Sequence, residues 1–265
     1  MAKKSNPRAA LKEYRAKRNF TKSPEPTGEE KPPPERAREL FFCVQKHWAS
    51  HLHYDFRLEH KGVLLSWAVP KGPSLKPSDK RLAMRVEDHP FDYGEFEGVI
   101  PEGYGAGIVM LWDRGSWSPE SGSIDEALSK GELKFKLNGV KLKGSWVLVR
   151  TGGAISRTWL LIKHRDEWSG DVDIAEFAPK SVKSDGTFKD ILTTGAPEVW
   201  ESHRTGSAPE GSQLAKVVAK VFSVEGGAAA PVTAKATTRA RKSKPAKTAP
   251  APASRPARSA ARKKS

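Results

Sequence analysis

The chain is poor in the features that mark secreted and membrane proteins. Cys43 is the single cysteine among 265 residues, so no disulfide framework can form within the chain. No apolar run approaches the roughly 20 residues that span a bilayer, and no apolar stretch follows the basic start as in a signal peptide. We therefore expect a protein of the reducing cytoplasm with no membrane partner. Cys43 lies in an apolar run, which favours a core residue over a nucleophile.

Acidic residues are scarce relative to basic ones, and the imbalance is concentrated at one end. The chain has 46 Lys and Arg against 31 Asp and Glu, a formal charge of +15. Residues 231–265 hold 11 of the basic residues and no acidic one. A segment of Ala, Pro, Lys and Arg cannot form a core but can neutralise phosphates, which predicts a disordered tail that binds nucleic acid without sequence preference. A merely solubilising tail is the alternative.

Composition divides the chain into a basic Pro-rich arm at 1–37, a folded domain at 38–200 and the tail at 201–265. Short runs of Val, Leu, Phe and Trp between Gly, Pro and Asp predict strands at 40–46, 52–59, 62–69, 81–87, 107–113, 132–137, 142–149 and 157–164. A helix is expected at 124–130, with Ser123 and Glu126 spaced as a capping box. The predicted fold is mostly β: a compact antiparallel β-barrel with a few short helices, an extended N-terminal arm and a disordered basic tail.

The densest chemistry lies in a strand predicted over 51–58. Alternate side chains of a strand share a face, which gives one apolar and one polar row: Leu52, Tyr54, Phe56 and Leu58 against His51, His53, Asp55 and Arg57. Imidazole nitrogens and a carboxylate suit a divalent transition metal, and a guanidinium suits a phosphate. His47 can reach the same site if the chain curls between the two segments. A polar strand face whose histidines only form hydrogen bonds is the alternative.

Three further segments carry weaker signals, each also explained by a charged solvated face or an ordinary turn. Arg81, Arg85 and Glu87 share a face of the next predicted strand, and His89 follows at its end. Lys71 follows another strand in a Pro-rich turn. The glycine-rich segment 101–107 lacks the Lys-Ser/Thr of a P-loop and has no strand–helix context, so it favours close backbone packing over phosphate binding.

Together these segments resemble the 3′-phosphoesterase domain of bacterial DNA ligase D, an enzyme of non-homologous end joining. The resemblance spans roughly residues 10–165 and is carried by the runs 47–59, 66–74, 86–90 and 97–103. It implies a compact β-barrel with a manganese-type metal site. No ligase or polymerase domain fits in the rest of the chain, so we expect a stand-alone, monomeric member in the bacterial cytoplasm, associated with the nucleoid.

The resemblance also assigns roles to residues. It implies metal ligands at His47, His53 and Asp55, with His51 outside the primary set. Phosphate contacts fall on Arg57, His89, Lys71 and Arg81, with Tyr93 lining the site and Glu87 in the same functional set. The N-terminal arm contributes Arg18, Asn19 and Glu25. Asn19 departs from the usual Asp, and an amide cannot act as a base or a charged partner, so the arm's contribution is open.

The implied activity removes a 3′-terminal ribonucleoside from a primer end, leaves a 3′-phosphate and then removes that phosphate. The implied partners are primer-template 3′ ends, an end-joining ligase and end-binding proteins. Two other functions fit part of the sequence: a non-catalytic nucleic-acid-binding module with a structural or degenerate metal site, and a metal phosphoesterase for small metabolites. The row of His53, Asp55 and Arg57 disfavours the first, since a binding face favours Lys, Arg and aromatics. The basic tail disfavours the second.

Overall fold

The computed structural model describes residues 7–18, 20, 27–28, 39–100, 104–194, 198–199 and 213–225. By their contacts, all of these belong to one unit of the chain, Met1–Ala228. Asn19 and Glu25, which the sequence assigned to the site, lie outside the described residues. The boundaries predicted at 37 and 200 stay a prediction.

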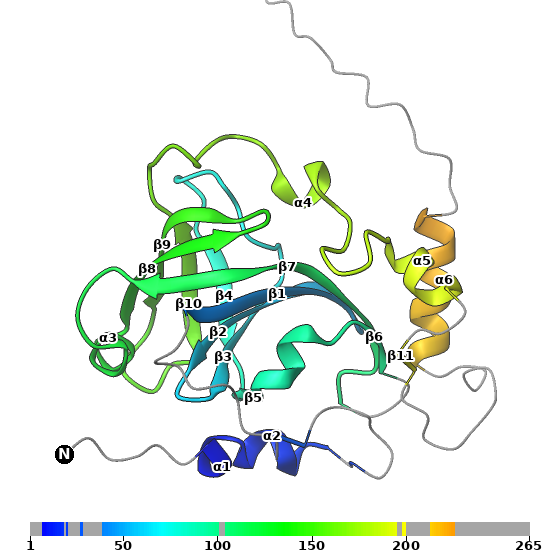
Figure 1. Ribbon diagram of the computed structural model, residues 1–265, viewed down its shortest axis with the longest axis horizontal. Helices are drawn as coiled ribbons and strands as arrows, with labels where there is room; N and C mark the ends of the chain where they lie inside the picture. The colour runs from blue at the N-terminus through cyan, green and yellow to red at the C-terminus, as the bar shows by residue number, and fades with distance from the viewer. Residues whose placement is uncertain are drawn as a thin grey trace, which may run out of the picture. The chain divides into compact units, whose positions relative to one another are not determined.

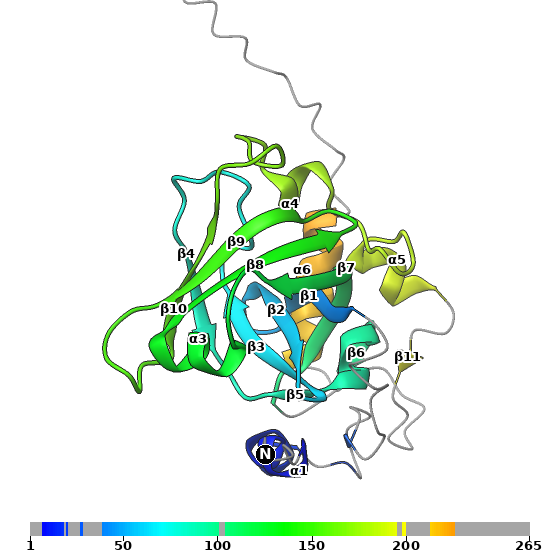
Figure 2. The same ribbon diagram turned by 60° about the vertical axis from the view of Figure 1, so that its left-hand side comes forward.

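A closed antiparallel barrel forms the body of the fold (Figures 1 and 2). Eight strands among the described residues close it in the order β1-β2-β3-β4-β10-β9-β8-β7, and β7 pairs with β1 again. Their bounds are Leu40–Trp48 (β1), Leu52–His60 (β2), Val63–Val69 (β3), Arg81–Arg85 (β4), Gly107–Pro119 (β7), Glu132–Gly139 (β8), Lys143–Arg150 (β9) and Thr158–Lys163 (β10). Three short strands extend this sheet: β5 (His89–Pro90) on β3, β6 (Gly98–Ile100) on β7, and β11 (Glu198–Val199) parallel to β6. Closure leaves the long strands without open edges.

The barrel interior is filled by the apolar row of each strand. In β8 the burial alternates residue by residue, with Leu133, Phe135 and Leu137 inside and lysines outside. On β2 the inward row is Tyr54, Phe56 and Leu58, as the alternation predicted, although Leu52 at the strand start is 38% exposed. Tryptophans occupy much of the remaining interior volume: Trp67, Trp112 and Trp146. Because the apolar row faces inward, the polar row of β2 faces the outside of the barrel wall.

The outer face of β1, β2 and β3 is covered by helical segments. The arm contains α1 (Pro7–Ala10) and α2 (Lys12–Ala16), which lie beneath the barrel beside β5 in both views (Figures 1 and 2). A 3₁₀ helix, η2 (Phe91–Glu95), contacts β1 and β3. The strand β7, which pairs with β1 on its other side, carries a bulge, since Val44 pairs with Asp113 but Gln45 pairs with Leu111. Bulges of this kind re-aim side chains next to functional sites.

The eight predicted strands are all present, as is the helix α3 (Ile124–Lys130). The predicted capping box is wrong, because the Ser123 side chain makes no capping hydrogen bond in the described structure. The first turn of α3 is instead tied to the β2–β3 turn, where Lys61 donates to the Asp125 carboxylate. A true capping box joins Thr187 and Asp190 at the start of α5 (Phe188–Thr193).

Two expectations about the chain ends need correction. The arm was expected to be extended, but α1 and α2 are helical, and Tyr14 of α2 is completely buried. The tail was expected to be disordered from residue 201, but residues 213–225 form the helix α6 (Gln213–Glu225). Leu214, Val217 and Val221 of α6 join the main hydrophobic core. The short helix α4 (Ile174–Phe177) completes the described helices, and none of these has the length and apolar character that a membrane-spanning segment requires.

Candidate metal centre

Three potential metal ligands meet on the outer wall of the barrel. His47 of β1 and His53 of β2 are direct partners in the antiparallel register, and Asp55 follows two residues later on the same face. Asp55 Oδ2 lies 3.5 Å from His47 Nδ1, and Asp55 Oδ1 lies 3.8 Å from His53 Nε2. One ligand atom from each residue lies within 4.8 Å of the others. Ligands at about 2.1 Å from one ion are roughly 3–4 Å apart, so the cluster fits a metal ion with little adjustment.

Backbone carbonyls select the nitrogen that each histidine presents. His47 Nε2 lies 2.9 Å from the Gly105 carbonyl, and His53 Nδ1 lies 2.9 Å from the His51 carbonyl. A carbonyl only accepts, so these nitrogens carry the hydrogen, and Nδ1 of His47 and Nε2 of His53 keep their lone pairs toward Asp55. This arrangement is typical of metal-ligating histidines, whose second nitrogen is held by a carbonyl or carboxylate.

The protonation states of Asp55 and His53 also suit a metal ion. Burial opposes ionisation of Asp55, but the neighbouring Arg57 cation holds the pKa of this carboxyl well below its usual range. Burial lowers the pKa of His53, which keeps the imidazole neutral near pH 7. An ionised carboxylate and a neutral imidazole are the forms that bind metals, so Asp55 and His53 need not release a proton first.

The guanidinium of Arg57 sits beside the cluster, and three neighbours fix its orientation. Arg57 is 2% exposed and donates from Nε to Gln45 Oε1 at 2.8 Å, from Nη1 to Ser66 Oγ at 2.8 Å and from Nη2 to Asp55 Oδ2 at 3.1 Å. Gln45 is fully buried and donates to the Tyr93 and Phe96 carbonyls, each at 2.9 Å. Gln45 thus ties Arg57 to the η2 segment. The remaining N–H groups of Arg57 are the donors left for a ligand.

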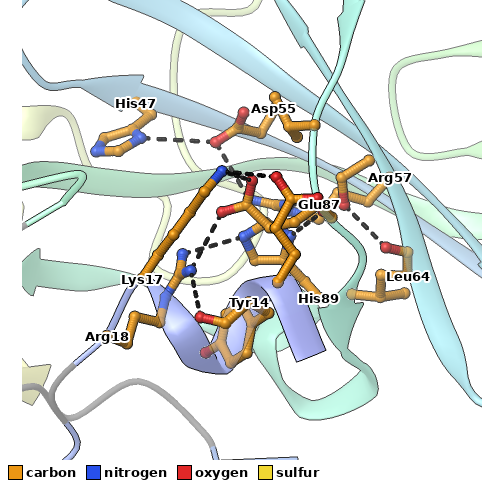
Figure 3. A network of polar contacts seen from close by, with 12 residues as sticks. Tyr14, Lys17, Arg18, His47, Asp55, Arg57, Leu64, Glu87 and His89 are labelled. Carbon is orange, nitrogen blue, oxygen red and sulfur yellow. Dashed lines mark hydrogen bonds and ion pairs between the residues drawn. The ribbon is translucent and has the colours of Figure 1, made fainter. Parts of the chain in front are cut away.

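The N-terminal arm supplies the facing side of the site (Figure 3). Lys17 Nζ donates to Glu87 Oε2 at 2.9 Å, and Arg18 Nη1 donates to Glu87 Oε1 at 3.2 Å. Burial opposes ionisation of Glu87, but the bonds from Lys17 and Arg18 leave its pKa below the usual value. Because the Glu87 side chain is only 2% exposed, this ion pair is shielded from solvent. Glu87 therefore docks the arm onto the barrel.

His89 lies at the centre of this contact and is neutral. Its Nδ1 donates to the Glu87 carbonyl at 2.9 Å, and its Nε2 accepts from Arg18 Nη2 at 3.3 Å. Burial together with the Arg57 and Arg18 cations lowers the pKa of His89 well below its ordinary value. The rings of Tyr14 and Tyr93 pack against the imidazole, with distances between ring centroids of 5.0 and 4.9 Å.

These groups line one pocket of about 470 Å³. The pocket brings together most of the residues expected from the sequence. They are His47, His53, Asp55, Arg57, Glu87, His89, Tyr93 and Arg18. Ala49, Ser50 and His51 of the β1–β2 turn, and Tyr104 and Gly105 of the glycine-rich segment, complete much of its rim.

Lys71 and Arg81 are not among the described residues that line this pocket. Lys71 is exposed in the turn after β3. Arg81 pairs in register with the core residue Leu161. It also lies two residues before the buried Ala83, on the same face of β4, so its strand position faces the inside of the barrel wall. Its guanidinium contacts Asp79 at 3.1 Å. Glu87 was expected to share the face of Arg81, but β4 ends at Arg85, and the chain then turns Glu87 into the pocket.

Several residues of the site were not singled out in the sequence. Gln45 had a signal: it stands two residues before His47, so the alternation places both side chains on one face. Lys17 and Tyr14 lie in the run 14–21 that the resemblance assigned to the N-terminal arm, but no local pattern joins them to Glu87 and His89, which lie about 70 residues away in the chain. Gly105 falls in the segment for which close backbone packing was expected. That packing is present at Gly107, where a Cβ would stand 2.1 Å from the Trp48 carbonyl oxygen.

Comparison with known proteins gives one family and several relatives. Residues 45–150 match the family model described as "DNA Ligase D 3'-phosphoesterase domain". The chain is 52% identical over 183 residues to the "Multifunctional non-homologous end joining protein LigD" of Pseudomonas aeruginosa, which covers 67% of this chain and 21% of that protein. The protein of the same name from Mycolicibacterium smegmatis is 39% identical over 175 residues, covering 64% of this chain and 22% of that protein. The chain thus spans about a fifth of the length of these curated relatives.

Proposed function

This chain carries a domain of the DNA ligase D 3′-phosphoesterase family at residues 45–150, and from that premise we propose that it is a metal-dependent hydrolase of phosphate esters at the 3′ ends of DNA or RNA strands. Its substrates are 3′-terminal ribonucleotides and 3′-phosphates, and its setting is DNA repair by non-homologous end joining, with primer-template ends, a ligase and end-binding proteins as partners. One observation carries the proposal. His47, His53 and Asp55 share a single pocket with Arg57 and His89.

Two nitrogens and one carboxylate oxygen suit a divalent transition metal such as Mn²⁺ better than the all-oxygen sites of Ca²⁺ or Mg²⁺. His47, His53 and Asp55 would hold it. When bound, a divalent metal polarises a phosphoryl oxygen and lowers the pKa of a coordinated water. The carbonyls of Gly105 and His51 hold the two imidazoles in the orientation in which they would bind such an ion.

Arg57 is the first phosphate contact in this proposal. Its guanidinium is already oriented by Gln45 and Ser66, so little side-chain entropy is lost when a phosphate binds. Buried donors aimed at developing negative charge typically contribute about 10²–10³-fold to rate. Arg18, which reaches the same pocket from the arm, adds a second cation.

His89 would act as a proton donor once the substrate phosphate is bound. In the free site its imidazole is neutral, because burial, Arg57 and Arg18 all disfavour the cation. An entering phosphate brings negative charge that offsets the two arginines and favours protonation of Nε2. Once Arg18 turns from Nε2 to the phosphate, Nε2 takes up a proton from water and donates it to a phosphate oxygen or to the leaving oxygen, while Nδ1 stays fixed on the Glu87 carbonyl.

The remaining assignments concern contacts around this centre. Glu87 is a positioning residue for the arm, since its carboxylate is occupied by Lys17 and Arg18. Lys71, exposed beyond β3, would meet the nucleic-acid backbone outside the pocket. The guanidinium of Arg81 is paired with Asp79 and does not line the pocket, so Arg81 would contact a phosphate only outside the pocket.

Activity is tested with a 5′-labelled primer-template that carries one 3′-terminal ribonucleotide, in the presence of Mn²⁺. The wild-type protein should shorten the primer to a 3′-phosphate and then to a 3′-hydroxyl, and EDTA should stop both steps. Binding of the primer-template without turnover would overturn the proposal and leave a non-catalytic nucleic-acid-binding module.

Metal binding is tested independently by thermal unfolding. Mn²⁺ should raise the Tm of the wild-type protein, because a ligand that binds the native state stabilises it. His53→Ala should remove this shift. His51→Ala is the matched control, because His51 lies two residues earlier, in the β1–β2 turn and outside the ligand cluster, and it should keep the shift.

A further inference from the structure

Tyr104 is an exposed aromatic residue at the rim of the pocket. It lines the pocket with 55% of its surface exposed, whereas Tyr93, deeper in the same pocket, is 3% exposed. An exposed ring at the mouth of a polar pocket contributes little to folding, because it buries little apolar surface. Its ring is therefore available to a ligand.

The backbone holds Tyr104 close to the metal ligands. The next residue, Gly105, has a φ of +84°, and its carbonyl is the group that fixes His47. Two residues further, Gly107 packs so closely on β1 that a Cβ would overlap the Trp48 carbonyl. Tyr104 thus stands one residue from a metal-ligand contact, on a segment pinned to the end of β1.

Two cations of the arm lie against the same ring. Lys17 Nζ is 5.1 Å and Arg18 Cζ is 5.8 Å from the Tyr104 ring centroid. Cations next to an exposed aromatic face are the combination with which proteins hold a single nucleotide: the ring stacks on the base and the cations meet the phosphate.

We propose that Tyr104 is the stacking surface for the 3′-terminal nucleoside that the pocket releases. This inference rests on the proposed function and names the part of the substrate that the residue contacts. Stacking on a phenol ring tolerates any base, so Tyr104 would give affinity for a terminal nucleoside without base preference. A 3′-phosphate end has no nucleoside beyond the phosphate and leaves this surface unused.

The test compares two primers that differ only at the 3′ end, one with a terminal ribonucleotide and one with a 3′-phosphate. Tyr104→Ala should lower kcat/KM on the ribonucleotide end by at least about fivefold, the equivalent of about 1 kcal/mol of stacking, mainly through KM. It should leave the 3′-phosphate reaction within about twofold of the wild type. Tyr104→Phe, which keeps the ring, should behave as wild type on both. Phe177→Ala removes another exposed ring, 77% exposed and away from the pocket, and should change neither reaction.

The possible outcomes distinguish failure of the stacking role from failure of the proposed hydrolase activity. Equal losses of Tyr104→Ala on both primers would mean that the residue only supports His47, and would overturn the stacking role. Unchanged kinetics on both primers would also overturn it. A wild-type protein that processes neither end would sink the proposed function, and this inference with it.

Discussion

Replacing Gln45 with leucine should destabilise the protein strongly, although Gln45 touches neither a metal ligand atom nor solvent. The substitution keeps a similar volume and removes the amide. In the native structure that amide satisfies the Arg57 Nε–H group and the carbonyls of Tyr93 and Phe96. Gln45 is fully buried, so no water can replace it without rearrangement.

The magnitude follows from the Arg57 Nε–H group and the Phe96 carbonyl, because the Tyr93 carbonyl keeps its hydrogen bond from the Phe96 N–H group. A buried polar group that loses its partner costs about 1–3 kcal/mol, and a charged donor such as Arg57 costs more. Relaxation of η2 would recover part of this, so we expect a loss of at least about 2 kcal/mol in the free energy of unfolding. Because domains are stable by only about 5–15 kcal/mol, the effect is large.

Urea unfolding of the two proteins measures this difference directly. Gln213→Leu is the control, because it makes the same chemical change at the partly exposed start of α6 and should shift stability by less than about 0.5 kcal/mol. A loss below about 1 kcal/mol for Gln45→Leu would refute the view that Gln45 couples Arg57 to η2.

Three further predictions concern chemistry, pH and the tail. His89→Ala and Arg57→Lys should each lower kcat by about 10²-fold or more in the primer assay, and wild-type rates in both would contradict their roles. Burial raises the pKa of Asp113 from 3.8 to about 6, so the native state holds a proton that the unfolded state has lost between about pH 4 and pH 6. The stability of the wild type relative to Asp113→Asn should therefore fall by up to about 3 kcal/mol as pH rises through this window, and a flat difference in urea unfolding would argue against the shift. Deleting residues 231–265 removes 11 positive charges, which should raise KM and flatten the salt dependence of DNA binding with kcat and Tm almost unchanged. If the deletion left the affinity for DNA unchanged at both low and high salt, the tail would not serve to bind nucleic acid.

The sequence was most informative for β2, where core residues and candidate site residues alternate along one strand. Alternation on β2 separated Phe56 from Asp55 and Arg57 correctly, because a side-chain period of two admits only two assignments and the apolar row has to face the core. The structure then brought His47 beside His53, a proximity that spacing alone left open.

Contacts between distant segments could not be derived in this way. The docking of Lys17 and Arg18 on Glu87 depends on where the chain goes after α2 and β4, which no local pattern records. For α6 the sequence does carry a local signal, since Leu214, Val217, Val218 and Val221 repeat at the spacing of one helix face. The composition of the predicted tail, 201–265, masks that local periodicity.

The Gly105 carbonyl that holds His47 also has a thermodynamic consequence. The segment with Tyr104 and the imidazole of a metal ligand share one hydrogen bond, so an ion that fixes the imidazole also restrains the rim, and a substrate that restrains the rim steadies the imidazole. Such linkage is reciprocal by necessity. The affinities for metal and for strand end are therefore expected to rise together, and each should be quoted with the concentration of the other.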